Sequence, residues 1–115
     1  NDRSALKAVI RKIQEGNGVV LFPEGTRSPD GQLQPGQPGI GLIVAKTLAP
    51  VVPMRIFGAY EAFPKAAKGV KFRRITVVVG EPLHFTAEDV GAGTREDYRR
   101  LSQRIMESIG NLELP

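Results

Sequence analysis

The stretch that decides the fold is Gly18-Val19-Val20-Leu21-Phe22-Pro23-Glu24-Gly25-Thr26-Arg27-Ser28. Residues 19–22 form a short apolar run that follows a glycine, and this pattern is typical of a buried strand. Pro23 has no N–H to donate and therefore ends the predicted strand, while Gly25 lets the backbone turn. The polar residues of the stretch then follow together, at the place where the strand ends.

Those polar residues have the chemistry of an anion-binding turn. The guanidinium of Arg27 matches a phosphate or carboxylate with two parallel hydrogen bonds, and Thr26 and Ser28 add hydroxyls. In open α/β sheets, ligands bind beyond the carboxyl ends of the strands. The turn at residues 22–28 is therefore the candidate binding site. The alternative is a purely structural turn in which Arg27 pairs with Glu24.

Working outward from this stretch, the chain divides into alternating helical and extended segments. Apolar residues recur at helical spacing before the turn, and Pro38 fits the first position of a second, buried helix. Pro53, inside the next apolar run, indicates an edge, a bulge or the start of a strand. The predicted elements are helix 4–15, strand 19–22, helix 38–48, strand 51–57, strand 72–80, an edge piece at 82–85 and helix 95–109.

A strand, a crossover helix and a second strand make a βαβ unit, whose strands are parallel. The predicted class is thus α/β, with a mixed, partly parallel sheet, one βαβ unit and flanking helices. Thr94 with Asp97 three residues later resembles a capping box, and Thr86 is the expected N-cap of an acidic turn. Gly39 and Gly41 do not form a dinucleotide fingerprint, and we interpret them as sites of close helix packing.

Composition limits the classes of function. The 115 residues suffice for a single domain over 1–115, and 41% hydrophobic with 24% charged residues is ordinary for a globular protein. The chain has no cysteine and one histidine, His84, so we expect no metal site.

The net charge of +4 is concentrated in one segment of the sequence. Its cations are Lys65, Lys68, Lys71, Arg73 and Arg74. Such a cluster meets phosphates, anionic lipid headgroups or an acidic carrier; the other interpretation is a solvated loop. We expect no nucleic-acid partner, because the segment matches no recognition module.

Residues 22–28 resemble the third motif of the glycerolipid acyltransferases, the family of 1-acylglycerol-3-phosphate acyltransferases. Val51-Val52-Pro53-Met54 is similar to the fourth motif of that family, and the Pro35-Gly36 turn before a buried helix fits the same pattern. The resemblance extends over nearly the whole chain. It implies that residues 1–115 are the C-terminal portion of a larger acyltransferase domain.

The resemblance also implies an activity and a set of site residues. A fatty acyl group would pass from an acyl-CoA or acyl carrier protein thioester to a hydroxyl of a lysophospholipid or glycerol phosphate acceptor, without a cofactor. Glu24, Gly25, Thr26 and Arg27 would hold the acceptor, with Arg27 on its phosphate, and Pro53 would shape the site. The implied location is cytoplasmic, with peripheral contact at the inner face of the membrane.

The sequence departs from the family pattern in its catalytic motif. In the family, an H-x-x-x-x-D motif upstream of the turn supplies the general base and the carboxylate that orients it. Only 21 residues precede Phe22 here, and none is histidine. His84 and Asp89 have the same spacing but lie downstream, where Thr86 fits an N-cap and Asp89 an acidic first turn of a helix. We therefore assign no catalytic residue within the chain. A second departure is Gln34, which occupies a position where the family often has lysine.

Two other functions remain open from the residues alone. One is a non-catalytic module that binds phosphate or a lipid headgroup through the same turn. The other is a basic nucleic-acid binder, which would bind generic duplex with an affinity that falls steeply as salt is raised.

The missing histidine predicts that these 115 residues alone do not transfer acyl groups. Without a general base the acceptor hydroxyl is a poor nucleophile, and such a base contributes on the order of 10²–10⁴ in rate. An assay with acyl-CoA and lysophosphatidate checks this expectation. Robust turnover that His84→Ala abolishes would contradict it.

Overall fold

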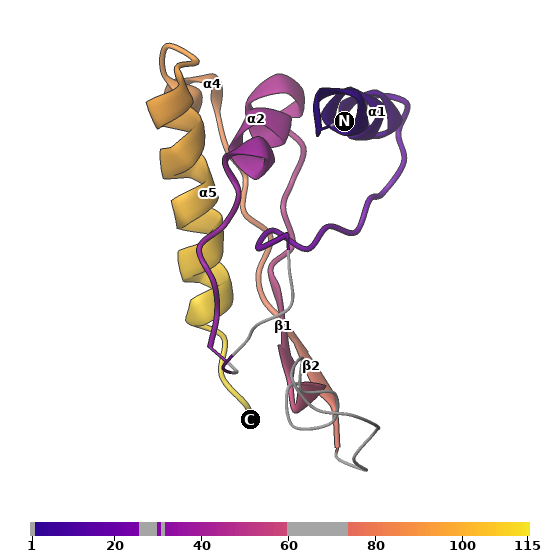
Figure 1. Ribbon diagram of the computed structural model, residues 1–115, viewed down its shortest axis with the longest axis vertical. Coiled ribbons are helices and arrows are strands. Elements are labelled where there is room, and N and C mark those ends of the chain that lie inside the picture. The colour runs from indigo at the N-terminus through magenta and orange to yellow at the C-terminus, as the bar shows by residue number, and fades with distance from the viewer. Residues whose placement is uncertain (1, 26–29, 31, 60–73) are drawn as a thin grey trace.

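The computed structural model describes residues 2–25, 30, 32–59 and 74–115. It has helices α1 (Asp2–Gln14), α2 (Pro38–Thr47), α4 (Ala87–Val90) and α5 (Arg95–Gly110), with strands β1 (Met54–Phe57) and β2 (Thr76–Val79). Figure 1 shows α5 along one side, α2 between α5 and α1 at one end, and the strand pair toward the other end. The mixed α/β class predicted from the sequence is confirmed.

Helix α2 is the central packing element, and its ends follow the predicted signals. Pro38 occupies the first turn, where its missing N–H is not needed. Leu48 ends the helix in the left-handed region, at a φ of 50°, and its N–H donates to the Val44 carbonyl. The helix contacts both α5 and α1. Its nearly all-round apolar surface is therefore covered on two sides.

The core lies where α5 meets α2 and the segment before α4. Its buried members are Val44, Phe85, Leu101, Ile105 and Ile109. A Cβ placed on Gly41 would collide with the backbone carbonyl of Tyr98, so α2 and α5 cross at a distance that only glycine permits. The prediction that these glycines allow close helix packing is confirmed.

The sheet consists of β1 and β2, which pair antiparallel in the register Met54↔Val79 through Phe57↔Thr76. Val51 and Leu83 extend the pairing as an isolated antiparallel bridge. Pro53 is buried immediately before β1, and its carbonyl accepts a hydrogen bond of 2.8 Å from the Gly80 N–H. Of the three alternatives for Pro53, the structure shows the start of a strand, and the expected short edge piece is present at Leu83.

The structure corrects one part of the predicted sheet. Residues 19–22 form no strand, and the pairing within the described parts of the chain is antiparallel, so no parallel βαβ unit is present there. Val20 is 78% exposed and Phe22 is 71% exposed. An apolar run becomes a strand only when a neighbouring strand pairs with its backbone N–H and C=O groups. Among the described residues β1 pairs with β2, and neither strand pairs with residues 19–22.

A capping carboxylate fixes the start of α5, and an arginine joins α5 to α4. Asp97 accepts hydrogen bonds from the Thr94 N–H (3.0 Å) and hydroxyl (2.9 Å), and from the Arg100 guanidinium (2.6 Å). The Thr94 backbone N–H, then Arg100, lower the pKa of Asp97. Arg100 also donates to the Asp89 carbonyl at 2.6 Å and so ties α4 to α5. Both predicted caps, at Thr86 and Thr94, are confirmed.

The Asp97 contacts predict a loss of stability in acid. The pKa of Asp97 in the folded chain lies below its ordinary value of 3.8, so its stabilisation is fully present above that pH and disappears as the pH falls toward the folded-state pKa. We expect Asp97→Asn to lower Tm at about pH 7 and the difference from wild type to shrink below about pH 4. Glu96→Gln, in the same turn, is the control and should show a smaller difference. Equal differences at both pH values would contradict the assignment.

Candidate functional site

The candidate site begins with a tight turn at residues 22–25. The Gly25 N–H donates to the Phe22 carbonyl at 3.0 Å, and Gly25 has a φ of +73°. That backbone conformation strains any residue with a Cβ, and a Cβ here would also lie 3.2 Å from the Gln37 side chain. Glycine is therefore favoured here by the backbone conformation, and any larger residue would also need the Gln37 side chain to shift by a few tenths of an ångström.

The Glu24 side chain joins this turn to the loop before α2. Its Oε2 accepts a hydrogen bond of 2.7 Å from the Gln34 backbone N–H. Gln37 adds two further ties, because its N–H donates to the Pro23 carbonyl at 2.7 Å and its side-chain amide donates to the Glu24 carbonyl at 3.2 Å. The turn and the loop at 34–37 are thus held together at three points.

The loop is fixed in turn to helix α5. The buried Ser102 hydroxyl donates to the Gln37 carbonyl at 2.6 Å and accepts from the Gly41 N–H at 3.1 Å. Gly36 lies so close to Met106 that a Cβ on it would be 2.8 Å from the Met106 side chain. The candidate turn is therefore positioned, through the loop, by the buried face of α5.

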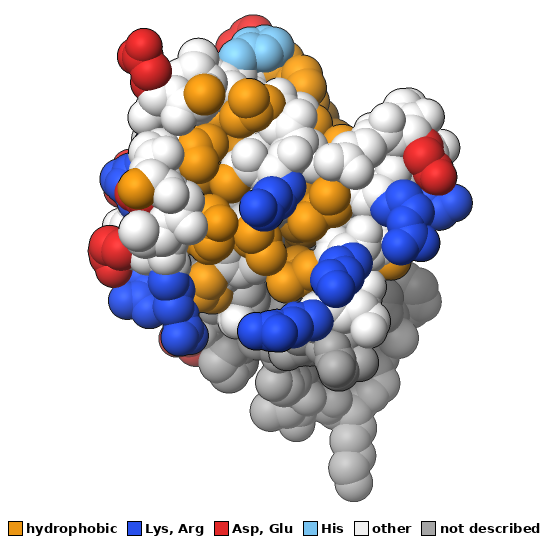
Figure 2. All heavy atoms as spheres, turned by 90° about the horizontal axis from the view of Figure 1, so that it is seen from above, with side chains coloured by type: hydrophobic (Ala, Val, Ile, Leu, Met, Phe, Trp, Pro, Cys, Tyr) orange, Lys and Arg blue, Asp and Glu red, His pale blue; other side chains and the backbone are white. Residues whose placement is uncertain are grey.

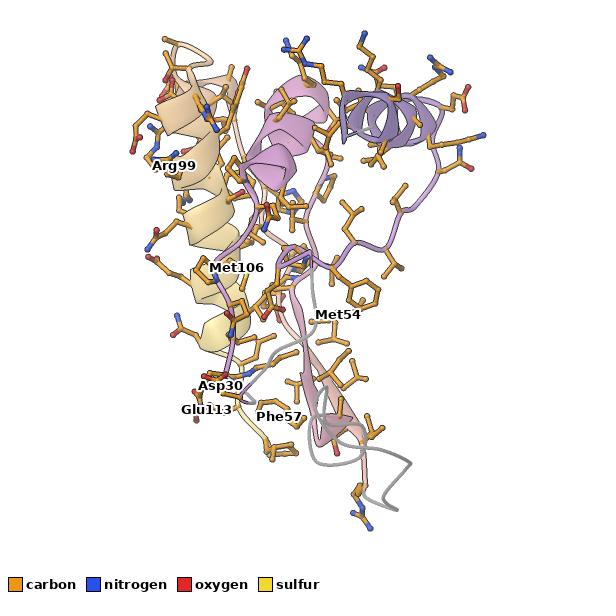
Figure 3. The ribbon with its side chains drawn as sticks, viewed as in Figure 1. Asp30, Met54, Phe57, Arg99, Met106 and Glu113 are labelled. Carbon is orange, nitrogen blue, oxygen red and sulfur yellow. The ribbon has the colours of Figure 1, made fainter. Side chains whose placement is uncertain are left out.

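An open groove of about 780 Å³ lies between this loop and α5. Figure 3 labels Arg99 and Met106 on the α5 wall. Polar and apolar groups share the lining, which includes Glu24, Gln34, Pro35, Arg99, Gln103 and Met106. The groove offers a guanidinium and side-chain amides beside aliphatic carbon, a combination that suits an amphipathic ligand.

The structure brings only some of the predicted site residues into view. Glu24 lines the groove and Gly25 makes the turn, whereas Thr26 and Arg27 lie outside the described residues, so the predicted Glu24–Arg27 pair remains a prediction. Pro53 lies beside the strand pair, and it is not one of the described residues that line the groove.

The second H-x-x-x-x-D pattern has a structural role at its aspartate. Asp89 accepts from the Thr86 N–H at 2.8 Å and contacts Arg104 at 3.4 Å. The Thr86 backbone N–H and hydroxyl lower the pKa of Asp89. The expected place of Asp89 in a first helical turn behind an N-cap at Thr86 is confirmed, and His84 is exposed.

Basic residues also gather on another part of the surface. Of the predicted cluster, Arg74 is exposed, and Lys65, Lys68, Lys71 and Arg73 lie outside the described residues. Helix α1 carries Arg3, Lys7 and Arg11 at four-residue spacing, all with exposed side chains. Figure 2 shows Lys and Arg side chains around a hydrophobic area on the face seen from above.

Sequence reasoning missed the residues that support the turn. Ser102 and Gln37 were not predicted, and neither were Arg99, Gln103 and Met106 on the groove wall. One signal was present for Ser102: it adjoins Leu101 on the apolar face of α5, where a serine needs a polar partner.

Comparison with known proteins agrees with the motif at this turn. A family model described as Acyltransferase matches residues 1–57, which include the turn, the loop and α2. The 1-acyl-sn-glycerol-3-phosphate acyltransferase BAT2, chloroplastic, of Brassica napus is 35% identical over 86 residues, which cover 74% of this chain and 25% of the relative. The 1-acyl-sn-glycerol-3-phosphate acyltransferase of Bacillus subtilis is 28% identical over 110 residues, which cover 96% of this chain and 52% of the relative.

A solved structure has the same fold. The crystal structure of the 1-acyl-sn-glycerophosphate acyltransferase PlsC from Thermotoga maritima matches with a TM-score of 0.71 and 28% identity. The chain belongs to the acyltransferase family. The match covers 96% of this chain and 46% of the Thermotoga acyltransferase, so the chain spans about half the length of that relative and a quarter of the Brassica one.

The described part of this acyltransferase-family chain holds neither a membrane-spanning helix nor a metal cluster. None of its described helices has the length and apolar character needed to cross a bilayer. Within the same residues, no three His, Cys, Asp or Glu side chains gather as a metal site would require.

The Glu24–Gln34 contact predicts a measurable effect on the loop. Glu24→Ala removes the acceptor of the Gln34 N–H, a loss of about 1 kcal/mol that corresponds to roughly 3–6 °C in Tm. Glu24→Gln keeps an acceptor oxygen and should lower Tm less. Amide exchange at Gln34 should accelerate in Glu24→Ala, while Glu81→Ala, at an exposed glutamate, serves as the control. Unchanged exchange at Gln34 in Glu24→Ala would show that the contact does not hold the loop.

Proposed function

We propose that the chain is part of an acyltransferase that moves a fatty acyl group to a hydroxyl of a lysophospholipid such as 1-acylglycerol-3-phosphate. The acyl donor is a thioester of coenzyme A or acyl carrier protein. The observation that carries the proposal is the candidate turn itself: two of its backbone carbonyls and the Glu24 carboxylate bind the loop before α2, within the segment that matches the family model.

The proposed roles follow from the chemistry of the turn. Arg27 binds the acceptor phosphate through two parallel hydrogen bonds, and Thr26 adds a hydroxyl. Gly25 gives the close backbone approach, and Glu24 holds the turn against Gln34. Pro53 sets the start of β1 and so helps to shape the surroundings of the site. The resemblance to the family is the source of these assignments to the acceptor.

The reaction joins the acceptor oxygen to the acyl carbon and breaks the carbon–sulfur bond of the thioester. The hydroxyl proton passes to a general base, and the thiolate leaves and takes up a proton. The residues before Phe22 contain no histidine to act as this base. We therefore assign binding and orientation of the acceptor to this chain, and proton transfer to a part of the acyltransferase outside residues 1–115.

We propose peripheral contact with the inner face of the membrane, where such acceptors are found. The exposed Arg3, Lys7 and Arg11 of α1 present positive charge at four-residue spacing, which suits anionic headgroups. The second candidate function is a headgroup-binding module without catalysis, which would use the same turn. Phosphate-dependent binding without transfer, even in a complete acyltransferase domain, would support that module.

Arg27→Lys tests the acceptor assignment. Lysine cannot reproduce the two parallel bonds, and a charged hydrogen bond contributes about 1.5–3 kcal/mol, so KM for a phosphorylated acceptor should rise roughly 10- to 150-fold. KM for the acyl donor should change little. The measurement uses a chimera in which this chain replaces the matched segment of the Bacillus subtilis relative.

Two comparisons sharpen this test. Arg95→Lys, at an exposed position of α5, is the matched control and should leave both Michaelis constants unchanged. If Arg27 only supports the turn, Arg27→Lys will instead lower Tm and raise both Michaelis constants together. That result would overturn the phosphate assignment.

A further inference from the structure

The first turn of α2 contains a side chain that comes from another helix. In a regular α-helix each N–H donates to the carbonyl four residues earlier, so the ordinary partner of the Gly41 N–H is the Gln37 carbonyl. The Ser102 hydroxyl of α5 lies between these two groups, because it accepts from the Gly41 N–H at 3.1 Å and donates to the Gln37 carbonyl at 2.6 Å. The first hydrogen bond of α2 is therefore bridged by a hydroxyl that is 65 residues from Gln37 in the sequence.

Close packing holds this hydroxyl in place. Of the polar side chains in the described part of the chain, Ser102 is the one that is buried, with 3% exposed. Gly41 lies against the backbone of Tyr98, and Gly36 lies against the Met106 side chain one turn along α5. Figure 1 shows the start of α2 and the loop before it beside α5. Because glycine permits the contact on both sides of Ser102, the bridge belongs to a tightly packed interface.

Gln37 connects the bridge to the candidate turn. Its carbonyl is held by Ser102, while its N–H donates to the Pro23 carbonyl at 2.7 Å and its side-chain amide donates to the Glu24 carbonyl at 3.2 Å. A change in the position of the Gln37 backbone must therefore alter the contacts of the turn. Thr26 and Arg27, to which the proposed function assigns the acceptor, follow this turn directly in the sequence.

We propose that Ser102 is a positioning residue of the acceptor site. By keeping the first hydrogen bond of α2 open, its hydroxyl sets the place of Gln37 and, through Gln37, the place of the turn that binds the acceptor phosphate. Without the hydroxyl, the Gly41 N–H pairs directly with the Gln37 carbonyl, and the first turn of α2 closes. Gln37 is then drawn away from Pro23 and Glu24. The part of this inference that concerns the acceptor rests on the proposed function, whereas the contacts do not.

Ser102→Ala separates this role from a general contribution to stability. The two backbone groups can pair with each other in the variant, so we expect Tm to fall by no more than about 5 °C. A misplacement of about 1 Å near a binding group can cost up to about 10²-fold in activity. In the Bacillus subtilis chimera described above, KM for the phosphorylated acceptor should therefore rise about 10-fold, while KM for the thioester donor stays within about twofold.

Two control variants on α5 accompany this measurement. Ser108→Ala removes a hydroxyl that donates to the Arg104 carbonyl of its own helix at 3.1 Å, and it should leave both Michaelis constants unchanged. Ile105→Val removes one methylene from the core and should lower Tm about as much as Ser102→Ala does. Because Ile105→Val keeps the bridge to Gln37, it should not raise KM for the acceptor.

Hydrogen exchange in the same chimera tests the bridge without reference to activity. The Gln37 N–H donates to the Pro23 carbonyl, and the Gly25 N–H donates to the Phe22 carbonyl within the turn. Both amides should exchange about 10-fold faster in Ser102→Ala, because the local structure that protects them is loosened. The Leu48 N–H, which donates to the Val44 carbonyl at the other end of α2, should exchange at the same rate in both proteins.

A double-mutant cycle links the bridge to the phosphate. If Ser102 acts through the turn that carries Arg27, the loss in kcat/KM for the acceptor in the double variant Ser102→Ala, Arg27→Lys will be smaller than the product of the two single losses. If the two residues act independently, the losses will multiply.

The outcomes distinguish this inference from the proposed function. Unchanged exchange at Gln37 and Gly25 in Ser102→Ala would overturn the inference, and so would an equal rise in both Michaelis constants, independent losses in the cycle or an acceptor KM that rises as much in Ile105→Val. Faster exchange together with an acceptor KM that responds to Ser102→Ala but not to Arg27→Lys would support Ser102 as the positioning residue and overturn the phosphate role of Arg27.

Discussion

The placing of the candidate site depends on one buried hydroxyl. Ser102 of α5 donates to the Gln37 carbonyl and accepts from the Gly41 N–H, so it satisfies two backbone groups at the start of α2. The first N–H groups of a helix have no partner within it, and α2 has no side-chain cap of its own. A buried polar group left unpaired costs about 1–3 kcal/mol, so this contact favours one position of α2 over its alternatives.

The Ser102 contact also positions the candidate turn, because it holds Gln37, which binds that turn. Gln37 is bound to Ser102 on one side, and on the other it donates to Pro23 and Glu24. Gly41 allows the approach of α2 to α5 that brings the Ser102 hydroxyl within reach. The turn is thereby fixed to a helix whose core side chains are almost fully buried, and its geometry does not depend on its own short sequence alone. Such a support is what a binding site on a loop requires.

Local chemistry made much of the fold predictable. Thr94 with Asp97, Pro38 and Gly41 each have a role that is decided within a few residues or by size alone, and each behaves as expected. The direction of strand pairing was not predictable in this way, because a strand at 19–22 needs a partner that no local pattern supplies. For the site, Glu24 and Gly25 were found from the motif, whereas Ser102 acts across 65 residues of sequence and only the fold reveals it.

The sequence motif does not distinguish between two roles for Glu24, and its contacts in the structure bear on this choice. A carboxylate in such a turn could bind the acceptor directly or hold the turn for its neighbours. Its Oε2 is directed to the Gln34 N–H, and the backbone carbonyl of the same residue accepts from Gln37. Both bonds join Glu24 to the loop before α2, so these contacts support a positional role for Glu24. In the proposed function, recognition of a phosphate is assigned to Arg27, and Glu24 holds the turn that precedes it.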